Sequence, residues 1–433
     1  MTVTLLHGGV ITTAIAPEQK APDAVLVADG KIAWIGDSTN ENDLPENAAE
    51  AERIDLAGGL VTPTFHDAKL DLCALGYHLT SVDTDSEPAA PQQISHALQT
   101  ALVACARAGY GFLNHHQVAP SAAEMQTLTE LAARDGGEFP RVDIYIGDRT
   151  PNAEHGHGFA SLAVDGNFSS HDAALVERYS DLPPPQWSED DPGSGETLLT
   201  VDEIAAHLVA ATKLGVPATL AARGDRALDD VRAAFEAAAQ QVGAEALRGA
   251  GHQVECADLI DATTLTTLVL FDVTIIAYPQ VALENYGAGG LYMQRLGPVR
   301  AQALHPWADL ITTGIELRFA SDAPHHALDP WGTVFAALSH PDRGQRMTMI
   351  DAFGAHTGGN IALLPGQAAN FAVWAPGRTA KYPLRTRRGY GQLETVITLP
   401  ALDMLGPDGL EGPLHCVQVF RQGRPLRMRH AEE

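Results

Sequence analysis

The sequence predicts an α/β protein in which a (β/α)8 TIM barrel carries a small β-sandwich domain formed by both termini. Three observations predict this fold. Apolar strand-like runs alternate about eight times with Ala-rich helical stretches between residues 61 and 364. Short strands with turn residues precede this region, and short strands return after it. We therefore expect a barrel over residues 61–364 and a composite β-domain over residues 1–60 plus 365–433.

The first 60 residues are typical of a small sheet. Their apolar runs span residues 2–6, 10–14, 24–28 and 31–35. The pair Asp29-Gly30 separates the last two runs, and such a pair is a strong hairpin signal because these residue types tolerate positive φ. After residues 364–366 (LPG) the chain returns to short strands at 370–374 and 417–421. The two ends are therefore expected to build one domain.

The barrel is expected to contain eight parallel strands with crossover helices between them. The strand-like runs span residues 60–72, 111–115, 141–146, 160–164, 218–222, 253–257, 273–278 and 316–321. The helical stretches include residues 91–108, 201–214, 227–241 and 330–338. Parallel strands need such crossovers, and eight units close a barrel whose active face lies at the carboxyl ends of the strands.

Charge and cysteine content limit the classes of partner and compartment. The chain has 28 Lys plus Arg against 54 Asp plus Glu, a formal net charge of −26, which argues against nucleic acid and anionic membranes as partners. The four cysteines show no paired spacing of a disulfide scaffold or zinc ribbon. No basic leader and no apolar stretch of about 18 residues is present. We expect a cytoplasmic protein that acts on a small molecule, and the oligomeric state stays open.

Five short motifs in register resemble the amidohydrolase superfamily. Residues 58–68 (GGLVTPTFHDA) are similar to its first barrel strand, whose pattern is Gly-x-x-x-x-Pro-Gly-Phe-x-Asp-x-His-x-His. The later motifs are residues 164–166 (VDG), 223–227 (RGDRA), 321–324 (SDAP) with 329–330 (DP), and 364–370 (LPGQAAN). They look like the long branch that includes N-substituted formamide deformylases. The resemblance implies a metal-dependent hydrolase of carbon–nitrogen bonds other than peptide bonds.

Most positions where this family holds its metal carry other residue types here. The resemblance implies a divalent metal at the barrel mouth that activates water. The His-x-His pair falls on Lys69 and Asp71, the bridging Lys on Ser161, the strand-five His on Ala221, and the Glu-His pair on Glu255-Cys256. The strand-eight Asp is kept as Asp322. Because an ammonium group donates and does not ligate, we expect no divalent metal cofactor at this site.

The alternation of side chains along a strand suggests how these residues face. Period two puts Asp67, Lys69 and Asp71 on one face of the first strand and turns His66 toward the helices. Lys69 is then expected beside Asp71, with Asp322 across the barrel. Two interpretations stay open. The three residues form a structural ion-pair cluster, or they form a metal-free catalytic site with Lys69 as donor, nucleophile or Schiff-base former and a carboxylate as base.

Four further side chains are candidates for the pocket: His115, Cys256, Gln280 and His325. His115 and His325 follow strands two and eight, whose loops open on the active face. A relocated zinc site of His115, Asp322 and His325 is one alternative, and ordinary polar loop residues are the other. Cys256 is interpreted as a nucleophile or as a small buried hydrophobic residue, and Gln280 as a ligand contact or a turn residue.

Two hypotheses for function follow, and the choice between them stays open. The first is a divergent amidohydrolase that acts on a small molecule with altered chemistry. The second is a catalytically silent descendant that binds a small molecule or a partner protein through the same mouth. The acidic, Pro-rich residues 181–196 are interpreted as a solvated loop or as a lid over that mouth. The histidines at 155 and 157 are expected on the opposite face, because they precede their strand.

Overall fold

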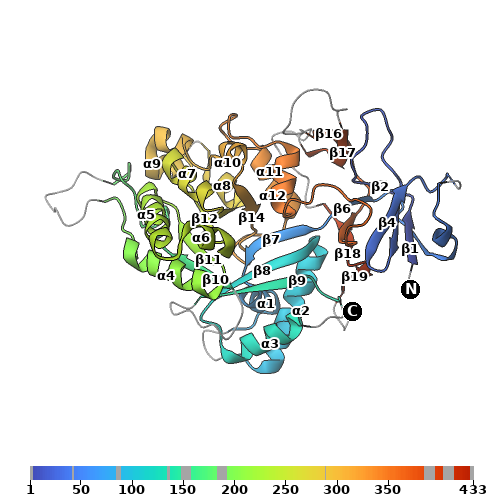
Figure 1. Ribbon diagram of the computed structural model, residues 1–433, viewed down its shortest axis with the longest axis horizontal. Coiled ribbons are helices and arrows are strands. Elements are labelled where there is room, and N and C mark those ends of the chain that lie inside the picture. The colour runs from blue at the N-terminus through green and yellow to red at the C-terminus, as the bar shows by residue number, and fades with distance from the viewer. Residues whose placement is uncertain are drawn as a thin grey trace.

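The computed structural model describes residues 3–40, 43–83, 89–133, 137–147, 158–182, 193–287, 289–384, 395–402 and 414–429. Residues 155 and 157, and residues 183–192 of the acidic segment, therefore lie outside the described part. Figure 1 shows a barrel of strands surrounded by helices, with the sheets built from the two termini at one side.

A parallel sheet of eight strands forms the barrel. Its strands are β7 (Phe65–Leu70), β8 (Tyr110–Val118), β9 (Arg141–Gly147), β10 (Gly158–Ala163), β11 (Ala218–Ala222), β12 (Gln253–Cys256), β13 (Thr274–Ala277) and β14 (Glu316–Phe319). They pair in sequence order. Beyond β14 the amide of Asp322 donates to the carbonyl of Lys69 (3.3 Å), and the amide of Asp71 donates to that of Ala323 (3.0 Å), so the last strand returns to the first. The predicted TIM barrel is confirmed.

Helices follow the strands and cover the outside of the barrel (Figure 1). They are α1 (Leu72–Thr80), α2 (Pro91–Arg107), α3 (Ala122–Ala132), α4 (Val201–Leu214), α5 (Asp225–Val242), α6 (Ala244–Ala250), α7 (Ala262–Leu270), α8 (Pro279–Asn285), α9 (Leu291–Gln302), α10 (Trp307–Thr313), α11 (Pro330–Leu338) and α12 (Met349–His356). The sequence begins α4 with a capping box, in which the hydroxyl of Thr200 accepts the amide of Glu203. On α5 the buried residues Val231, Phe235 and Ala238 recur at helical spacing and face the strands.

Sheets from both termini pack beside the barrel. One contains β1 (Val3–His7), β3 (Ala24–Ala28), β4 (Lys31–Gly36) and β5 (Glu52–Asp55), with the 3-10 helix η1 (Glu46–Glu50) between the last two. The next contains β2 (Val10–Ile11), β6 (Leu60–Pro63), β15 (Phe371–Trp374), β18 (Cys416–Arg421) and β19 (Arg424–Pro425), and β16 (Thr379–Leu384) pairs with β17 (Thr395–Pro400). The predicted hairpin joins β3 to β4, with positive φ at Asp29 and Gly30. Because β15 lies between β6 and β18, the two ends of the chain share one sheet.

The stretch at residues 60–72 is divided, although the sequence suggested one strand. Residues up to Pro63 belong to β6 in the terminal sheet, β7 starts at Phe65, and α1 begins at Leu72. Proline has no N–H to donate to a ladder, so a strand commonly ends there. Phe65 packs edge-on against Trp331 at 4.9 Å and Trp374 at 5.8 Å between ring centroids. This aromatic contact joins the outside of the barrel to the terminal sheet.

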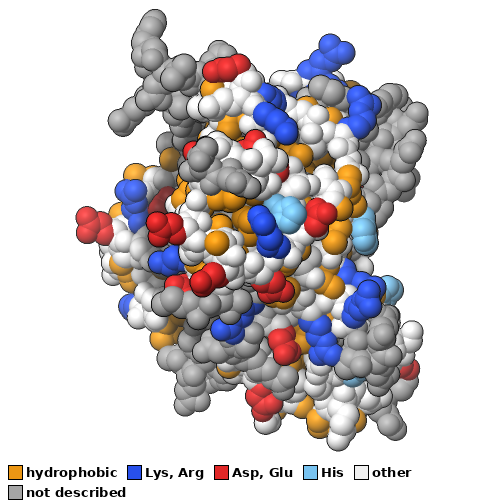
Figure 2. All heavy atoms as spheres, turned by 90° about the vertical axis from the view of Figure 1, so that its right-hand side faces the viewer, with side chains coloured by type: hydrophobic (Ala, Val, Ile, Leu, Met, Phe, Trp, Pro, Cys, Tyr) orange, Lys and Arg blue, Asp and Glu red, His pale blue; other side chains and the backbone are white. Residues whose placement is uncertain are grey.

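Figure 2 shows the face formed by the terminal sheets, where acidic and basic side chains are interspersed with apolar ones. Within the described residues, no helix is long and apolar enough to cross a membrane.

Candidate functional site

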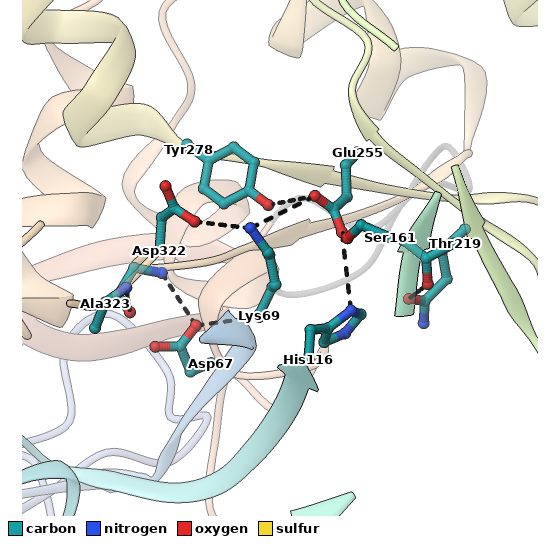
Figure 3. Close-up of polar contacts among 11 residues, drawn as sticks. Asp67, Lys69, His116, Ser161, Thr219, Glu255, Tyr278, Asp322 and Ala323 are labelled. Atoms are coloured by element: carbon teal, nitrogen blue, oxygen red, sulfur yellow. Dashed lines mark hydrogen bonds and ion pairs between the residues drawn. The ribbon is translucent and has the colours of Figure 1, made fainter. Parts of the chain in front are cut away.

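An ammonium group shared by two carboxylates lies inside the mouth of the barrel (Figure 3). Lys69, near the end of β7, donates from Nζ to Oδ1 of Asp322 at 2.8 Å. The same nitrogen lies 3.8 Å from Oε2 of Glu255 on β12. Asp322 follows β14, so three strands supply the group. We call Lys69, Glu255 and Asp322 the lysine cluster.

Glu255 is the buried member of the lysine cluster, and other side chains hold its carboxylate. The hydroxyl of Tyr278 donates to Oε2 at 2.8 Å, and the hydroxyl of Ser161 donates to Oε1. Nδ1 of His116 lies 3.9 Å from Oε1. The ring of Tyr278 also faces the Lys69 ammonium, with 5.4 Å from Nζ to the ring centroid. A buried carboxylate is costly without such partners, and here it has several.

The surroundings of Lys69 keep its side chain protonated. Burial alone would lower the pKa of Lys69, but the negative charges of Glu255 and Asp322 outweigh it and hold the pKa above its usual range. A nucleophilic or Schiff-base lysine needs a free amine near neutral pH. Lys69 is therefore an ammonium group that donates hydrogen bonds.

His116 lies beside the lysine cluster as a neutral side chain. It stacks on Tyr145 with 4.3 Å between ring centroids. Burial, and then the charge of Lys69, lower the pKa of His116 well below its usual range. Both ring nitrogens are buried without a hydrogen-bond partner among the described residues. His116 thus adds unpaired polar atoms to the barrel interior.

The side chains of β7 do not alternate as the sequence suggested, because its register with β8 shifts twice. His66 shares a hydrogen bond of 2.9 Å with Asn114, which lies on the same face of β8 as His116. Ala68 belongs to a buried apolar cluster that includes Ile276 on β13. His66 and Ala68 therefore face the barrel interior, and the expectation that His66 points at the helices is wrong.

Asp67 is a fully buried carboxyl group on β7, two residues before Lys69. Its Oδ1 accepts the amide of Ser321 at 3.0 Å. It also accepts the amide of Lys69 at 3.2 Å, and Figure 3 labels both residues of this second contact. Its Oδ2 has no hydrogen-bond partner among the described residues. Burial, opposed in part by these hydrogen bonds, raises the pKa of Asp67 to about 7. The carboxyl group thus joins β7 to the segment after β14.

Asp71 lies apart from Lys69, in a second polar group at the start of α1. It caps this helix by accepting the amide of Ala74 at 3.0 Å. Nδ1 of His115 lies 4.0 Å from Asp71 and accepts the amide of Leu72 at 3.0 Å. With Cys73, these side chains offer ligand atoms within 4.8 Å of one another. Nδ1 of His115 already accepts a backbone amide, and burial raises the pKa of the Cys73 thiol.

The remaining candidates occupy different places around the mouth. Cys256 is buried with a left-handed backbone (φ 70°), and burial raises the pKa of its thiol. Gln280 lies in the first turn of α8, where its Nε2 donates to the carbonyl of Asp329 at 3.4 Å. His325 is exposed in the turn after Asp322. Among the described residues, the set of His115, Asp322 and His325 is not gathered within ligand distance.

Several residues at the centre of the site were not predicted from the sequence. Glu255, Tyr278, Ser161 and His116 all face the interior around Lys69. Ser161 stands where the family has a lysine, and Glu255 matches the Glu of the family's Glu-His pair, but neither was predicted as a site residue. An acidic residue inside an apolar strand needs a buried partner, and this signal could have pointed to Glu255.

The chain belongs to the amidohydrolase family, whose description matches residues 73–364. Imidazolonepropionase from Paracoccus denitrificans (strain Pd 1222) is 30% identical over 142 residues, which cover 33% of this chain and 30% of that protein. The chain therefore matches less than a third of this curated relative's length.

Solved structures share the fold. An uncharacterized metal-dependent hydrolase from Pyrococcus furiosus superposes with a TM-score of 0.67 at 19% identity, over 86% of this chain and 98% of that one. Guanine deaminase from C. acetobutylicum superposes with a TM-score of 0.58 at 10% identity, over 98% of this chain and 100% of that one.

Proposed function

We propose that this protein hydrolyses a carbon–nitrogen bond of a small molecule without a metal, and that the Lys69 ammonium supplies the positive charge at the mouth. The observation that carries the proposal is the lysine cluster, in which Nζ of Lys69 lies 2.8 Å from Asp322 and 3.8 Å from Glu255. Membership of the amidohydrolase family supports hydrolysis. The motif at residues 223–227 supports the branch of N-substituted formamide deformylases.

The donor set at the inherited positions does not fit a divalent metal. Lys69 is an ammonium group, Ala221 has no ligand atom, and the thiol of Cys256 is buried with a raised pKa. Asp322, the carboxylate kept from the family pattern, already accepts the hydrogen bond of Lys69. One or two carboxylates beside a fixed positive charge make a poor cation site, so no step is assigned to a metal.

Lys69 has the geometry of an electrophilic donor. Among the described residues, only the contact of Lys69 with Asp322 is short enough for a hydrogen bond, so further N–H groups of Lys69 can serve a substrate carbonyl. About a quarter of each side chain, 24% for Lys69 and 25% for Asp322, is accessible to water. A fixed ammonium group aimed at a developing oxyanion lowers the barrier because it needs no reorganisation during the reaction.

Asp322 serves as the base in this scheme. Its carboxylate takes a proton from water while the water oxygen bonds to the carbonyl carbon, and the C=O electron pair becomes an oxyanion beside Lys69. The carbon–nitrogen bond then breaks, and the proton on Asp322 passes to the leaving nitrogen. The products are a carboxylic acid and an amine, and Asp322 is again a carboxylate.

The test is turnover of a panel of N-substituted formamides and small amides by protein kept in chelator. Lys69→Met should lower kcat/KM by about 10²–10³-fold, and Asp322→Asn by about 10²–10⁴-fold. Lys213→Met, on the exposed side of α4, is the matched control and should keep full turnover. Turnover that appears only after a metal is added would contradict the proposal.

A silent binding protein is the second candidate, and one observation favours it. The charge of Lys69 already faces two carboxylates, as expected of an ion-pair cluster whose role is structural. Under this candidate the panel would bind without release of amine or formate. Equilibrium binding measured beside turnover distinguishes the two functions.

A further inference from the structure

We propose that Arg223 binds a carboxylate group on the substrate, so that the protein acts on anionic small molecules. This inference deepens the proposed function, because it names the substrate class of the same site. It rests on the position, the anchoring and the unused hydrogen-bond donors of one side chain.

Arg223 directly follows β11, at the carboxyl end of the strand where the barrel opens. Earlier on the same strand, the side chain of Thr219 contacts Gln253 of β12 inside the barrel. The charges of Arg223 and Lys69 both act on the buried thiol of Cys256. Arg223 is therefore a second cation at the same mouth.

A series of buried polar groups holds the side chain of Arg223 in place. Its Nη1 donates to Oδ2 of Asp258 at 3.1 Å, and Nε2 of His305 lies 3.2 Å from the other oxygen. The hydroxyl of Tyr286 lies 2.7 Å from Nδ1 of His305. Asp258 and His305 are each only 5% exposed. A guanidinium held this way loses little freedom when a ligand binds.

The outer part of the guanidinium remains available. Arginine carries five N–H donors, and in the described part of the chain only Nη1 of Arg223 has a protein acceptor. The side chain is 27% accessible to water; burial alone would lower the pKa of Arg223, but neighbouring acidic groups hold it above its usual range. A planar pair of free donors suits a carboxylate, which can accept two parallel hydrogen bonds.

The local charges favour Arg223 over Lys69 for this role. The carboxylates of Glu255 and Asp322 beside Lys69 would repel the carboxylate of a substrate. Arg223 pairs with one carboxylate, and His305 shares that carboxylate. A substrate would thus place its carboxylate on Arg223 and its scissile carbonyl at Lys69.

The test compares probes that differ only in charge. The N-acetyl derivatives of glycine, leucine and phenylalanine are titrated beside their uncharged amides, by calorimetry on the full chain. The wild-type protein should bind at least one acid about tenfold more tightly than its amide. Arg223→Gln should abolish this preference, and Arg223→Lys should keep part of it because a point charge remains.

Controls separate charge recognition from damage to the fold. Arg248→Gln removes an exposed arginine of α6 with the same change in net charge, and it should keep the preference. Arg223→Gln combined with Asp258→Asn avoids an uncompensated buried carboxylate, and it should also lose the preference. Equal binding of acids and amides by the wild type, no binding of any probe, or a preference that survives Arg223→Gln would overturn the inference.

The same variants distinguish this inference from the proposed function. Lys69→Met should lower kcat/KM by about 10²–10³-fold and leave the preference for acids intact. A preference for acids without any turnover would refute hydrolysis and retain the anion site. Turnover with no preference for acids would refute only the role of Arg223.

Discussion

Replacing Lys69 by Met removes the cation from between two carboxylates, and we expect a loss of about 3–5 kcal/mol of folding free energy at neutral pH. At an effective dielectric constant of about 20, the Coulomb attraction is about 6 kcal/mol at the distance to Asp322 and about 4 kcal/mol at that to Glu255. Desolvation of Lys69 in the wild type offsets part of this sum. The variant also leaves the buried carboxylate of Glu255 and the nearby carboxylate of Asp322 without the cation that compensates them.

Urea unfolding followed by circular dichroism measures this loss, with Lys213→Met as the control, for which a change within about 0.5 kcal/mol is expected. The double variant Lys69→Met/Asp322→Asn should recover part of the loss, because a neutral amide replaces one of the unpaired charges. The difference from wild type should shrink at acidic pH, since protonation removes the excess negative charge. Equal effects of Lys69→Met and Lys213→Met would refute the account of the lysine cluster.

Two other substitutions test the buried residues Asp67 and Phe65 of β7. Because burial raises the pKa of Asp67 to about 7, the folded state holds its proton more tightly than the unfolded state, and stability should fall by roughly 4 kcal/mol as pH rises from about 4 through about 7. Asp67→Asn should remove this loss of stability. If the free energy of unfolding of the variant still fell between acidic and mildly alkaline pH as much as that of the wild type, the assignment to Asp67 would be wrong. Phe65→Ala should cost about 3–5 kcal/mol, because Phe65 packs on Trp331 and Trp374; a cost below about 1 kcal/mol in urea unfolding would show that the aromatic contact is not a link between barrel and sheet.

The fold was predictable because its signals are local. The run at residues 218–222 is β11, and the run at residues 253–257 contains all of β12. Both are short runs bounded by helical stretches, so they could be predicted as strands without knowing the register or the neighbouring strand. The Asp29-Gly30 hairpin follows in the same way from the conformations that two residues tolerate.

The site was predictable only in part, because it depends on register. The contact of Lys69 with Asp322 followed from family positions, but Asp71 turns away to cap α1. Simple alternation fails on β7, where the register shifts place His66 rather than Asp67 in the barrel interior. Such irregularities arise from pairing with the neighbouring strand, and a single strand's sequence does not encode them.

The second polar group shows the same limit. Sequence placed His115 near the pocket, and the structure places it against the first turn of α1, beside Asp71 and Cys73. Its role depends on which backbone amide reaches its ring nitrogen. That amide, of Leu72, belongs to a helix start whose position is set by the cap at Asp71.

The metal content of active protein tests whether hydrolysis proceeds without a metal. The full chain is purified without chelators, its zinc, manganese and iron are quantified per chain, and turnover of the formamide and amide panel is measured before and after dialysis against EDTA. We predict only trace metal and the same turnover before and after dialysis, because Lys69 supplies the positive charge at the mouth. Near-stoichiometric metal, lost together with turnover on dialysis and restored with it, would contradict the account.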